Sequence, residues 1–127
     1  IVADVVRVPD TGTLRGDLIV MLEALRRVLA HPVLGEVARV LVAERDPVLV
    51  AMHAEFVEQR RSAMGEVLAR AVDRGEIPRP EDTEAAVDAV TAPLFWRHLG
   101  RRVRTGERHV VAVVDDFLAR HGAGLPA

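Results

Sequence analysis

The stretch from Asp46 to Gly75 constrains the fold of this chain more than any other part of its sequence. Asp46 followed by Pro47 is a typical helix start, because the carboxylate accepts free backbone N–H groups and proline needs no donor there. No further proline occurs before Gly75, which permits the left-handed backbone that ends many helices, and Pro78 prevents continuation. The sequence therefore predicts one long helix over residues 46–74, with apolar side chains repeating along one face to form the backbone of the core.

Two shorter helices are predicted before this one. Leucines recur at three- and four-residue spacing from Leu14 to Leu29, which predicts a helix over residues 14–30. Pro32 then opens a second amphipathic run that ends near residue 44. Both patterns place apolar side chains on one side, as expected for helices that pack on a shared core.

Two more helices are predicted after the long one. Thr83 is the expected N-cap of a helix that continues to residue 100. Pro93 inside it indicates either a kink over residues 89–93, which we expect, or a junction of two helices. Valines and Phe117 at helical spacing predict a last helix that reaches about residue 120. We therefore expect an all-α bundle of about five helices, and no alternation typical of strands outweighs this interpretation.

The composition narrows the classes of function. With 17 basic and 19 acidic residues, the chain has no global positive field to attract nucleic acid. Cysteine, tyrosine, asparagine and lysine are absent and Ser62 is the only serine, which argues against catalysis. No segment is typical of a membrane span or a signal peptide, so we expect a cytoplasmic protein that contacts no membrane. The exclusive use of arginine as the basic residue is typical of a GC-rich bacterium.

Three segments resemble the C-terminal domain of TetR/AcrR-type transcriptional regulators. They are Pro9-Asp-Thr-Gly-Thr-Leu-Arg-Gly-Asp-Leu18, Val67-Leu-Ala-Arg-Ala-Val-Asp-Arg-Gly-Glu-Ile-Pro78 and Ala92-Pro-Leu-Phe-Trp-Arg-His-Leu99. Their order and distances, followed by a last amphipathic helix, cover nearly the whole chain. The resemblance implies a TetR C-terminal-domain-like helical bundle that binds a small effector and forms a homodimer.

The same resemblance implies a domain organisation. Residues 1–9 are expected to be the tail of a connecting helix and a linker, and residues 10–127 the ligand-binding and dimerisation domain. We expect that this sequence does not include the helix-turn-helix headpiece of the family, and the resemblance implies that DNA is bound only through that headpiece. Repression relieved by the effector is the family norm, and we expect no cofactor.

The long helix carries two polar residues on its apolar face, His53 and Arg60. One interpretation places them in a cavity for a mostly apolar effector, with Arg60 holding an anionic group. The other pairs Arg60 internally with Glu23 or Asp88, since a charge in the core needs a partner. The candidates for the ligand site are Met21, Met52, His53, Phe56, Arg60, Met64 and Phe95.

In the family, the last two long helices pair with their mates across a two-fold axis, which here implies residues 83–100 and 107–121. Apolar residues on the last helix leave area for such a partner. Phe95 and Trp96 next to Pro93 would line the pocket, anchor the dimer or simply pack in the core. The candidates for the interface of a C2 homodimer are Val87, Leu94, Trp96, Val110, Val114, Phe117 and Leu118.

The remaining patterns have simpler interpretations. Arginines at 97, 101, 102, 104 and 108 are expected to be a solvated helix end rather than a nucleic-acid surface. The five histidines show no metal-binding spacing, so we expect no metal. Two rival functions stay open: a free-standing helical interaction module without ligand, and a small helical enzyme that uses carboxylates such as Glu55 and Glu58, although both fall on the solvent side of the long helix.

Overall fold

The structure is a computed structural model that describes residues 7–122, and all regular secondary structure in this range is helical. The expected all-α fold is thereby confirmed. The helical segments are α2 (Leu14–Ala30), α3 (Leu34–Ala43), α4 (Pro47–Asp73), α5 (Thr83–Phe95), the π-helical turn η1 (Trp96–Gly100) and α6 (Glu107–His121). The predicted tail of a connecting helix falls largely on residues 1–6, outside the described residues, and residues 7–9 are not helical.

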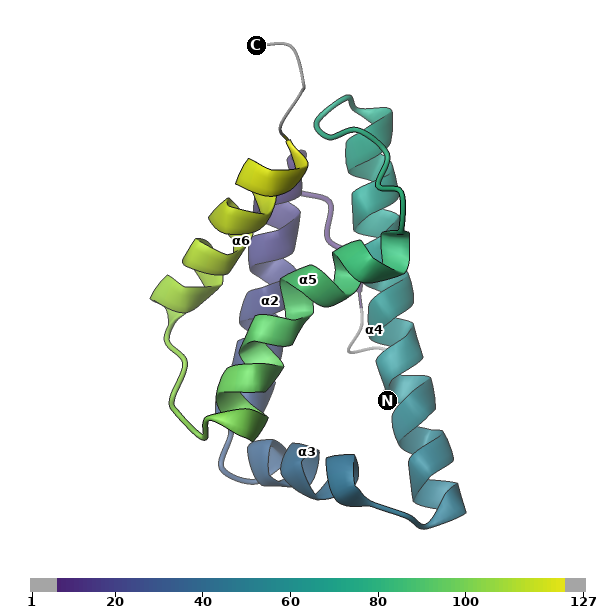
Figure 1. Cartoon of the computed structure of the whole chain (residues 1–127), viewed down its shortest axis with the longest axis vertical. Coiled ribbons are helices and arrows are strands. Elements are labelled where there is room, and N and C mark those ends of the chain that lie inside the picture. The colour runs from purple at the N-terminus through teal and green to yellow at the C-terminus, as the bar shows by residue number, and fades with distance from the viewer. Residues whose placement is uncertain (1–6, 123–127) are drawn as a thin grey trace.

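Helix α2 is the centre of the bundle. It packs against α3, α4 and α6, and α5 crosses between α4 and α6 on the side that faces the viewer in Figure 1. The short helix α3 lies across one end of the bundle and leads to the start of α4 (Figure 1). The core is formed where α2, the second half of α4, α5 and α6 meet, and its leucines and valines are almost completely excluded from solvent.

The predicted helix starts are mostly confirmed by hydrogen bonds. The Asp46 carboxylate accepts from the backbone N–H groups of Val48 and Leu49, at 2.9 and 3.2 Å. Helix α5 differs by one residue: Asp82, not Thr83, is the N-cap, and its carboxylate accepts from the N–H of Ala85 at 3.0 Å. A charged side chain is thus the cap, and Thr83 becomes the first helical residue.

Pro93 does not end helix α5. Helix α5 continues through Pro93 to Phe95, and the irregular hydrogen bonding follows it, where the N–H of Arg101 donates to the carbonyl oxygen of Trp96 at 2.9 Å. This bond spans five residues and makes η1 a π-helical turn. Helical hydrogen bonding therefore continues through Pro93, which removes one donor, and the change of hydrogen-bonding pattern comes one turn later; a bend of the helix axis near residues 89–93 stays a prediction.

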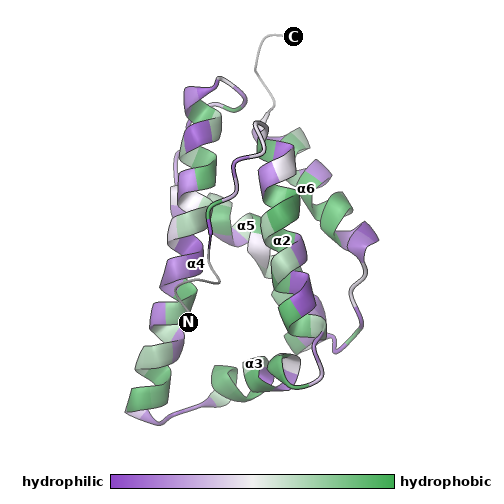
Figure 2. Ribbon diagram, turned by 180° about the vertical axis from the view of Figure 1, so that it is seen from behind, coloured by the Kyte–Doolittle hydropathy of each residue, from purple (hydrophilic) through white to green (hydrophobic). Residues whose placement is uncertain are grey.

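Helix α4 is buried only along its second half. Ala63, Met64, Val67, Leu68 and Ala71 pack in the core. The first half extends beyond the other helices, and with α3 it exposes a band of hydrophobic residues (Figure 2). The expectation that one face of the whole helix forms the core was therefore wrong for its first turns, because no other helix in the described chain covers them.

Candidate functional site

An apolar cavity lies between α2, α4 and α5, with a volume of about 290 Å³. We call it the apolar cavity. Its walls are Met21, Leu22 and Leu25 from α2, Val57, Arg60, Arg61 and Met64 from α4, and Val87, Asp88, Thr91, Ala92 and Phe95 from α5. Most of these side chains are hydrophobic, so the cavity suits a ligand whose body is apolar.

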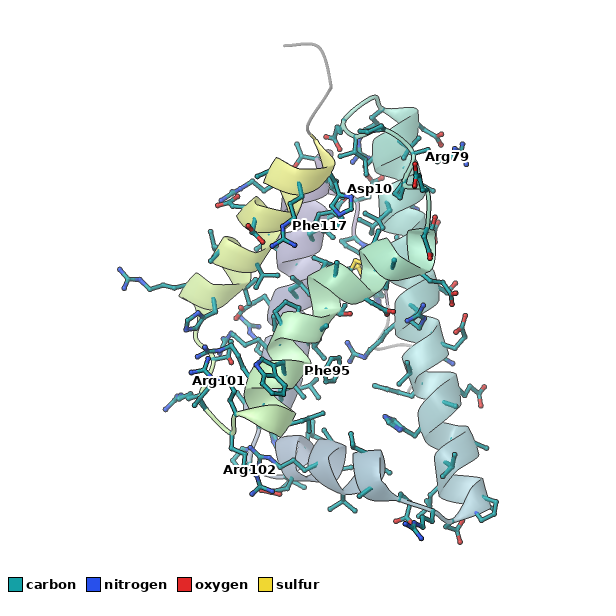
Figure 3. The ribbon with its side chains drawn as sticks, in the orientation of Figure 1. Asp10, Arg79, Phe95, Arg101, Arg102 and Phe117 are labelled. Carbon is teal, nitrogen blue, oxygen red and sulfur yellow. The ribbon has the colours of Figure 1, made fainter. Side chains whose placement is uncertain are left out.

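Four of the residues predicted for the ligand site meet in this cavity. Met21, Arg60, Met64 and Phe95 come from three different helices and line the same space. Figure 3 shows Phe95 on the side of α5 that faces α4. Three helices therefore bring together side chains that lie far apart in the sequence.

The other three predicted residues line a different space. Met52, His53 and Phe56 lie in a hollow of about 350 Å³ beside Leu41 and Leu49, which we call the α3–α4 hollow. Met52 is 62 % exposed and Leu49 is 41 % exposed, so this hollow is open to solvent. The predicted ligand site thus divides into two adjoining groups of residues rather than one.

The stacked pair of Arg60 and Phe56 joins these two groups. The Arg60 guanidinium carbon lies 4.8 Å from the centre of the Phe56 ring, within the range of a cation–π interaction. Arg60 lines the apolar cavity and Phe56 lines the α3–α4 hollow, one helical turn apart on α4. A ligand in either space would therefore contact one member of this pair.

Arg60 has no carboxylate partner in the described part of the chain, so the expected ion pair with Glu23 or Asp88 was wrong. Glu23 pairs with Arg26, and Asp88 pairs with the neighbouring Arg61. The Nε of Arg60 is buried and has no hydrogen-bond acceptor among residues 7–122. Burial lowers the pKa of the Arg60 guanidinium, although an arginine keeps its charge at neutral pH. The result is a partly desolvated cation at the cavity wall with an unused donor.

Most residues predicted for the dimer interface lie in the core of the single chain. Five of the seven, Val87, Leu94, Val110, Val114 and Phe117, are at most 4 % exposed within the single chain. These five side chains therefore have almost no surface left to offer a partner, and their place in a dimer interface stays a prediction. The physical reason is that their faces of α5 and α6 pack on α2 and on each other. Trp96 is 65 % exposed and Leu118 is partly exposed, so these two remain available.

The outer sides of α5 and α6 form a separate face. No other helix lies in front of them in the view of Figure 1. Ala89 and Pro93 of α5 and Val113 of α6 line a shallow hollow of about 100 Å³ on this face. We call this surface, together with Trp96, the α5–α6 face.

Sequence reasoning missed the role of His98. This residue is 9 % exposed, and its Nε2 lies 2.8 Å from the carbonyl oxygen of Gly35 at the start of α3. The guanidinium of Arg39 approaches both Nδ1 and the carbonyl oxygen of His98, at 3.5 Å each. His98 thereby attaches η1 to α3. Its place one turn after buried Leu94 was the only sequence signal for an inward orientation.

The arginines in and after η1 are not a uniform solvated helix end. Arg97 donates to the Thr105 hydroxyl and to the Arg104 carbonyl oxygen, both at 3.0 Å, and so fixes the loop between η1 and α6. Arg101, Arg102 and Arg104 are exposed, as expected of a helix end.

Among residues 7–122, no three His, Asp or Glu side chains gather as metal ligands do. In the same range, no helix has the length and apolar character of a membrane span.

Comparison with known proteins identifies the family. Residues 8–117 match the family model described as tetracyclin repressor-like, C-terminal domain, which covers most of the chain. The chain belongs to this family. It is 30 % identical over 112 residues to proteins named as uncharacterized HTH-type transcriptional regulators in Mycobacterium bovis and Mycobacterium tuberculosis. The match covers 87 % of this chain and 55 % of each relative, so the chain spans about half the length of these relatives.

Proposed function

We propose that this chain is the effector-binding and dimerisation domain of a TetR-type transcriptional regulator, and that the whole regulator represses transcription in the absence of effector. The family and the names of the mycobacterial relatives support the regulatory role. DNA would be contacted by a helix-turn-helix headpiece, the motif for which those relatives are named. The domain described here would supply the response to the ligand.

The observation that carries the ligand part of the proposal is the environment of Arg60. The apolar cavity offers methionine, leucine, valine and phenylalanine side chains to a hydrophobic body. Arg60 offers a charge that lacks a carboxylate partner in residues 7–122 and a buried Nε without an acceptor. A guanidinium binds a carboxylate through two parallel hydrogen bonds. We infer that the effector is a small, mostly apolar molecule with one anionic group.

The dimer part of the proposal rests on the α5–α6 face. Trp96 is a large aromatic side chain that is 65 % exposed next to Pro93, and aromatic residues are enriched at the centres of protein interfaces. A two-fold axis through this face would bring α5 and α6 of two copies together. An effector that binds one dimer arrangement more tightly would change the spacing of two headpieces and weaken their binding to operator half-sites.

The two rival functions have less support. Glu55 and Glu58 are exposed on α4, and the matched relatives are named as regulators rather than enzymes. A ligand-free interaction module would be expected to fill its core, whereas the apolar cavity leaves space beside Arg60 and Phe95.

Decanoate and 1-decanol are suitable probes of the ligand site, because they share an apolar chain and differ in charge. We expect decanoate to raise the melting temperature of the chain more than 1-decanol does, and Arg60→Met to remove the difference. Arg70→Met on the same helix is the matched control, because Arg70 already pairs with Glu66 at 3.0 Å. If decanoate stabilises Arg60→Met as much as the unsubstituted chain, the role given to Arg60 is wrong. If neither probe stabilises the chain, the cavity is not a site for such ligands.

A further inference from the structure

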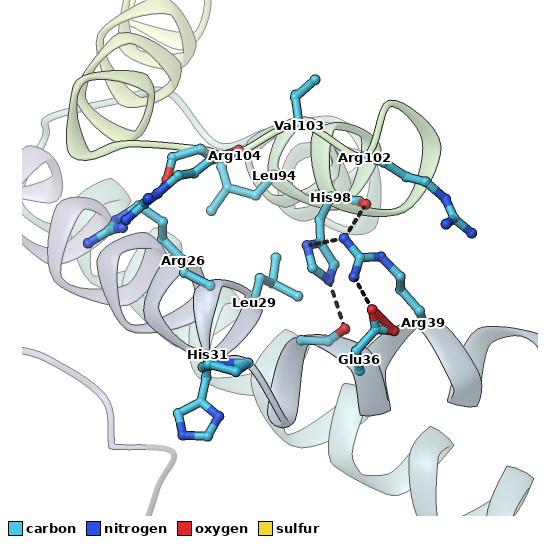
Figure 4. Close-up of a pocket in the computed structure, with 14 residues that line it drawn as sticks. Arg26, Leu29, His31, Glu36, Arg39, Leu94, His98, Arg102, Val103 and Arg104 are labelled. Carbon is cyan, nitrogen blue, oxygen red and sulfur yellow. Dashed lines mark hydrogen bonds and ion pairs between the residues drawn. The ribbon is translucent and has the colours of Figure 1, made fainter.

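A second pocket, of about 460 Å³, lies on another side of the bundle. Unlike the apolar cavity, it is rich in charged and polar side chains. It is enclosed by the end of α2, the start of α3, η1 and the loop of residues 101–106 (Figure 4). Its lining includes the cationic or titratable side chains of Arg26, His31, Arg39, His98, Arg102 and Arg104. Glu36 is the only acidic residue in the lining. We call this space the arginine pocket.

The positive charges of the arginine pocket are only partly neutralised. Arg26 pairs with Glu23, and Arg39 pairs with Glu36 at 2.7 Å. Arg102 and Arg104 form no ion pair with any residue between 7 and 122. The Nε of Arg39 is buried and has no acceptor in the same range. The pocket therefore holds surplus charge and an unused donor.

The backbone around these arginines is held in a definite conformation. Arg102 has a φ of 55°, the left-handed region that costs a non-glycine residue about 1 kcal/mol or more. Hydrogen bonds from Arg97 to Thr105 and to the Arg104 carbonyl oxygen keep the loop in this shape. Arg102 and Arg104 are therefore positioned beside the pocket by a strained but anchored loop.

The floor of the pocket is apolar. Figure 4 shows Leu29 and Leu94 between Arg26 and Arg104 on one side and Arg39 and His98 on the other. Both leucines line the pocket, and both are largely buried. This arrangement suits a compact molecule whose oxyanion reaches the guanidinium groups while its carbon skeleton lies on the leucines.

We propose that the arginine pocket is a second ligand site, which binds a small oxyanion of the phosphate or carboxylate class. It is separate from the apolar cavity: the two lining sets share no residue. The concave shape favours a small molecule over the backbone of a nucleic-acid duplex. Because η1 and α3 both line the pocket, a bound anion would also link these two segments beside the His98–Gly35 hydrogen bond.

Calorimetric titration of the chain with pyrophosphate and, separately, with citrate tests this proposal and distinguishes the two anion classes. We expect saturable binding of at least one probe at one molecule per chain. Arg102→Gln and Arg104→Gln should each weaken it about tenfold or more, since each removes a charged hydrogen-bond donor. Arg101→Gln is the matched control, because Arg101 is exposed, adjacent in sequence and outside the lining. Arg101→Gln should leave the affinity within about twofold of the unsubstituted chain.

Three results would overturn the proposal. The first is that neither probe saturates. The second is that Arg101→Gln weakens binding as much as Arg102→Gln, which would indicate diffuse attraction to surface charge. The third is that a DNA duplex of arbitrary sequence displaces pyrophosphate, which would make these arginines a nucleic-acid surface. The test does not depend on the apolar cavity, so a failure of decanoate binding would leave it unaffected.

Discussion

The Nε2 of His98 lies 2.8 Å from the carbonyl oxygen of Gly35 and joins the end of the α5–η1 segment to the beginning of α3. A carbonyl oxygen only accepts hydrogen bonds, so Nε2 must donate. In the neutral ring Nδ1 then carries the lone pair and accepts from Arg39, whose guanidinium only donates. The neighbouring groups thus determine that Nε2 donates and that Nδ1 accepts.

Replacing His98 by alanine should destabilise the chain. The substitution removes the hydrogen bonds of His98 with the Gly35 carbonyl oxygen and with Arg39, which should cost about 1–3 kcal/mol of unfolding free energy. Urea denaturation followed by circular dichroism measures this loss. His109→Ala on the exposed side of α6 is the control, and equal effects of the two substitutions would contradict the structural role of His98.

Two helical glycines should respond in opposite ways to alanine. A Cβ atom at Gly35 would collide with the carbonyl oxygen of Leu29 and would lie 3.2 Å from Cε1 of His98, so Gly35→Ala should cost about 1–3 kcal/mol. A Cβ atom at Gly65 in α4 meets nothing within 4 Å, so Gly65→Ala should add about 0.5–1 kcal/mol of stability. Denaturant midpoints of both variants test this, and a stabilising Gly35→Ala would contradict the close approach of α3 to α2.

The stability of the chain should depend on Glu23 in a definite pH window. A hydrogen bond from Arg26 is the largest cause that holds the pKa of Glu23 below its usual value. Because the folded pKa is lower than the unfolded value of about 4.3, ionised Glu23 stabilises the folded state above that pH, and the effect is lost as the pH falls through the lowered value.

Glu23→Gln removes this contribution. We expect its unfolding free energy to fall below that of the unsubstituted chain at pH 7, and the two to converge as the pH drops below about 4.3. Glu81→Gln is the control, because Glu81 is exposed and forms no ion pair within residues 7–122. If the difference in unfolding free energy between Glu23→Gln and the unsubstituted chain stays constant between pH 7 and pH 3, the charge of Glu23 is not the cause of that difference.

The proposed dimer should depend on Trp96. Trp96→Glu places a charge on the α5–α6 face, and burying an unpaired charge there should shift the chain from dimer to monomer. Val42→Glu is the matched control, because Val42 is 60 % exposed on α3, away from this face. Sedimentation equilibrium measures both variants. A monomeric unsubstituted chain, or dissociation caused by Val42→Glu alone, would contradict the proposed interface.

Local signals predicted the helices well and their burial less well. The predicted first helix matches α2 from Leu14 to Ala30, because a cap and a strict leucine repeat define it. The apolar repeat of α4 is similar along its whole length, yet only residues from Ala63 onward pack in the core. Which half is covered depends on where α2 and α5 cross α4, and helical periodicity contains no information on that crossing.

The same limit applies to the candidate sites. Periodicity placed Val110 and Val114 on one apolar face of the last helix. It could not distinguish a face that packs inside the chain from one that contacts a partner. The predicted ion pair of Arg60 failed because Arg61 and Arg26 lie closer to the two carboxylates considered. The arginine pocket combines residues from α2, α3, α5, η1 and the loop that follows η1, so no single stretch of sequence indicated it.

Helix α3 is held to the bundle in an unusual way. Its only fully buried residue is Gly35, while Val37, Val40 and Val42 are exposed, so it gains little from hydrophobic burial. Cooperative units of a protein open independently when few buried contacts join them to the rest. The backbone amides of α3 should therefore exchange with deuterium through local opening, well before those of α2 exchange through global unfolding. A molecule that joins η1 to α3 would slow that exchange first.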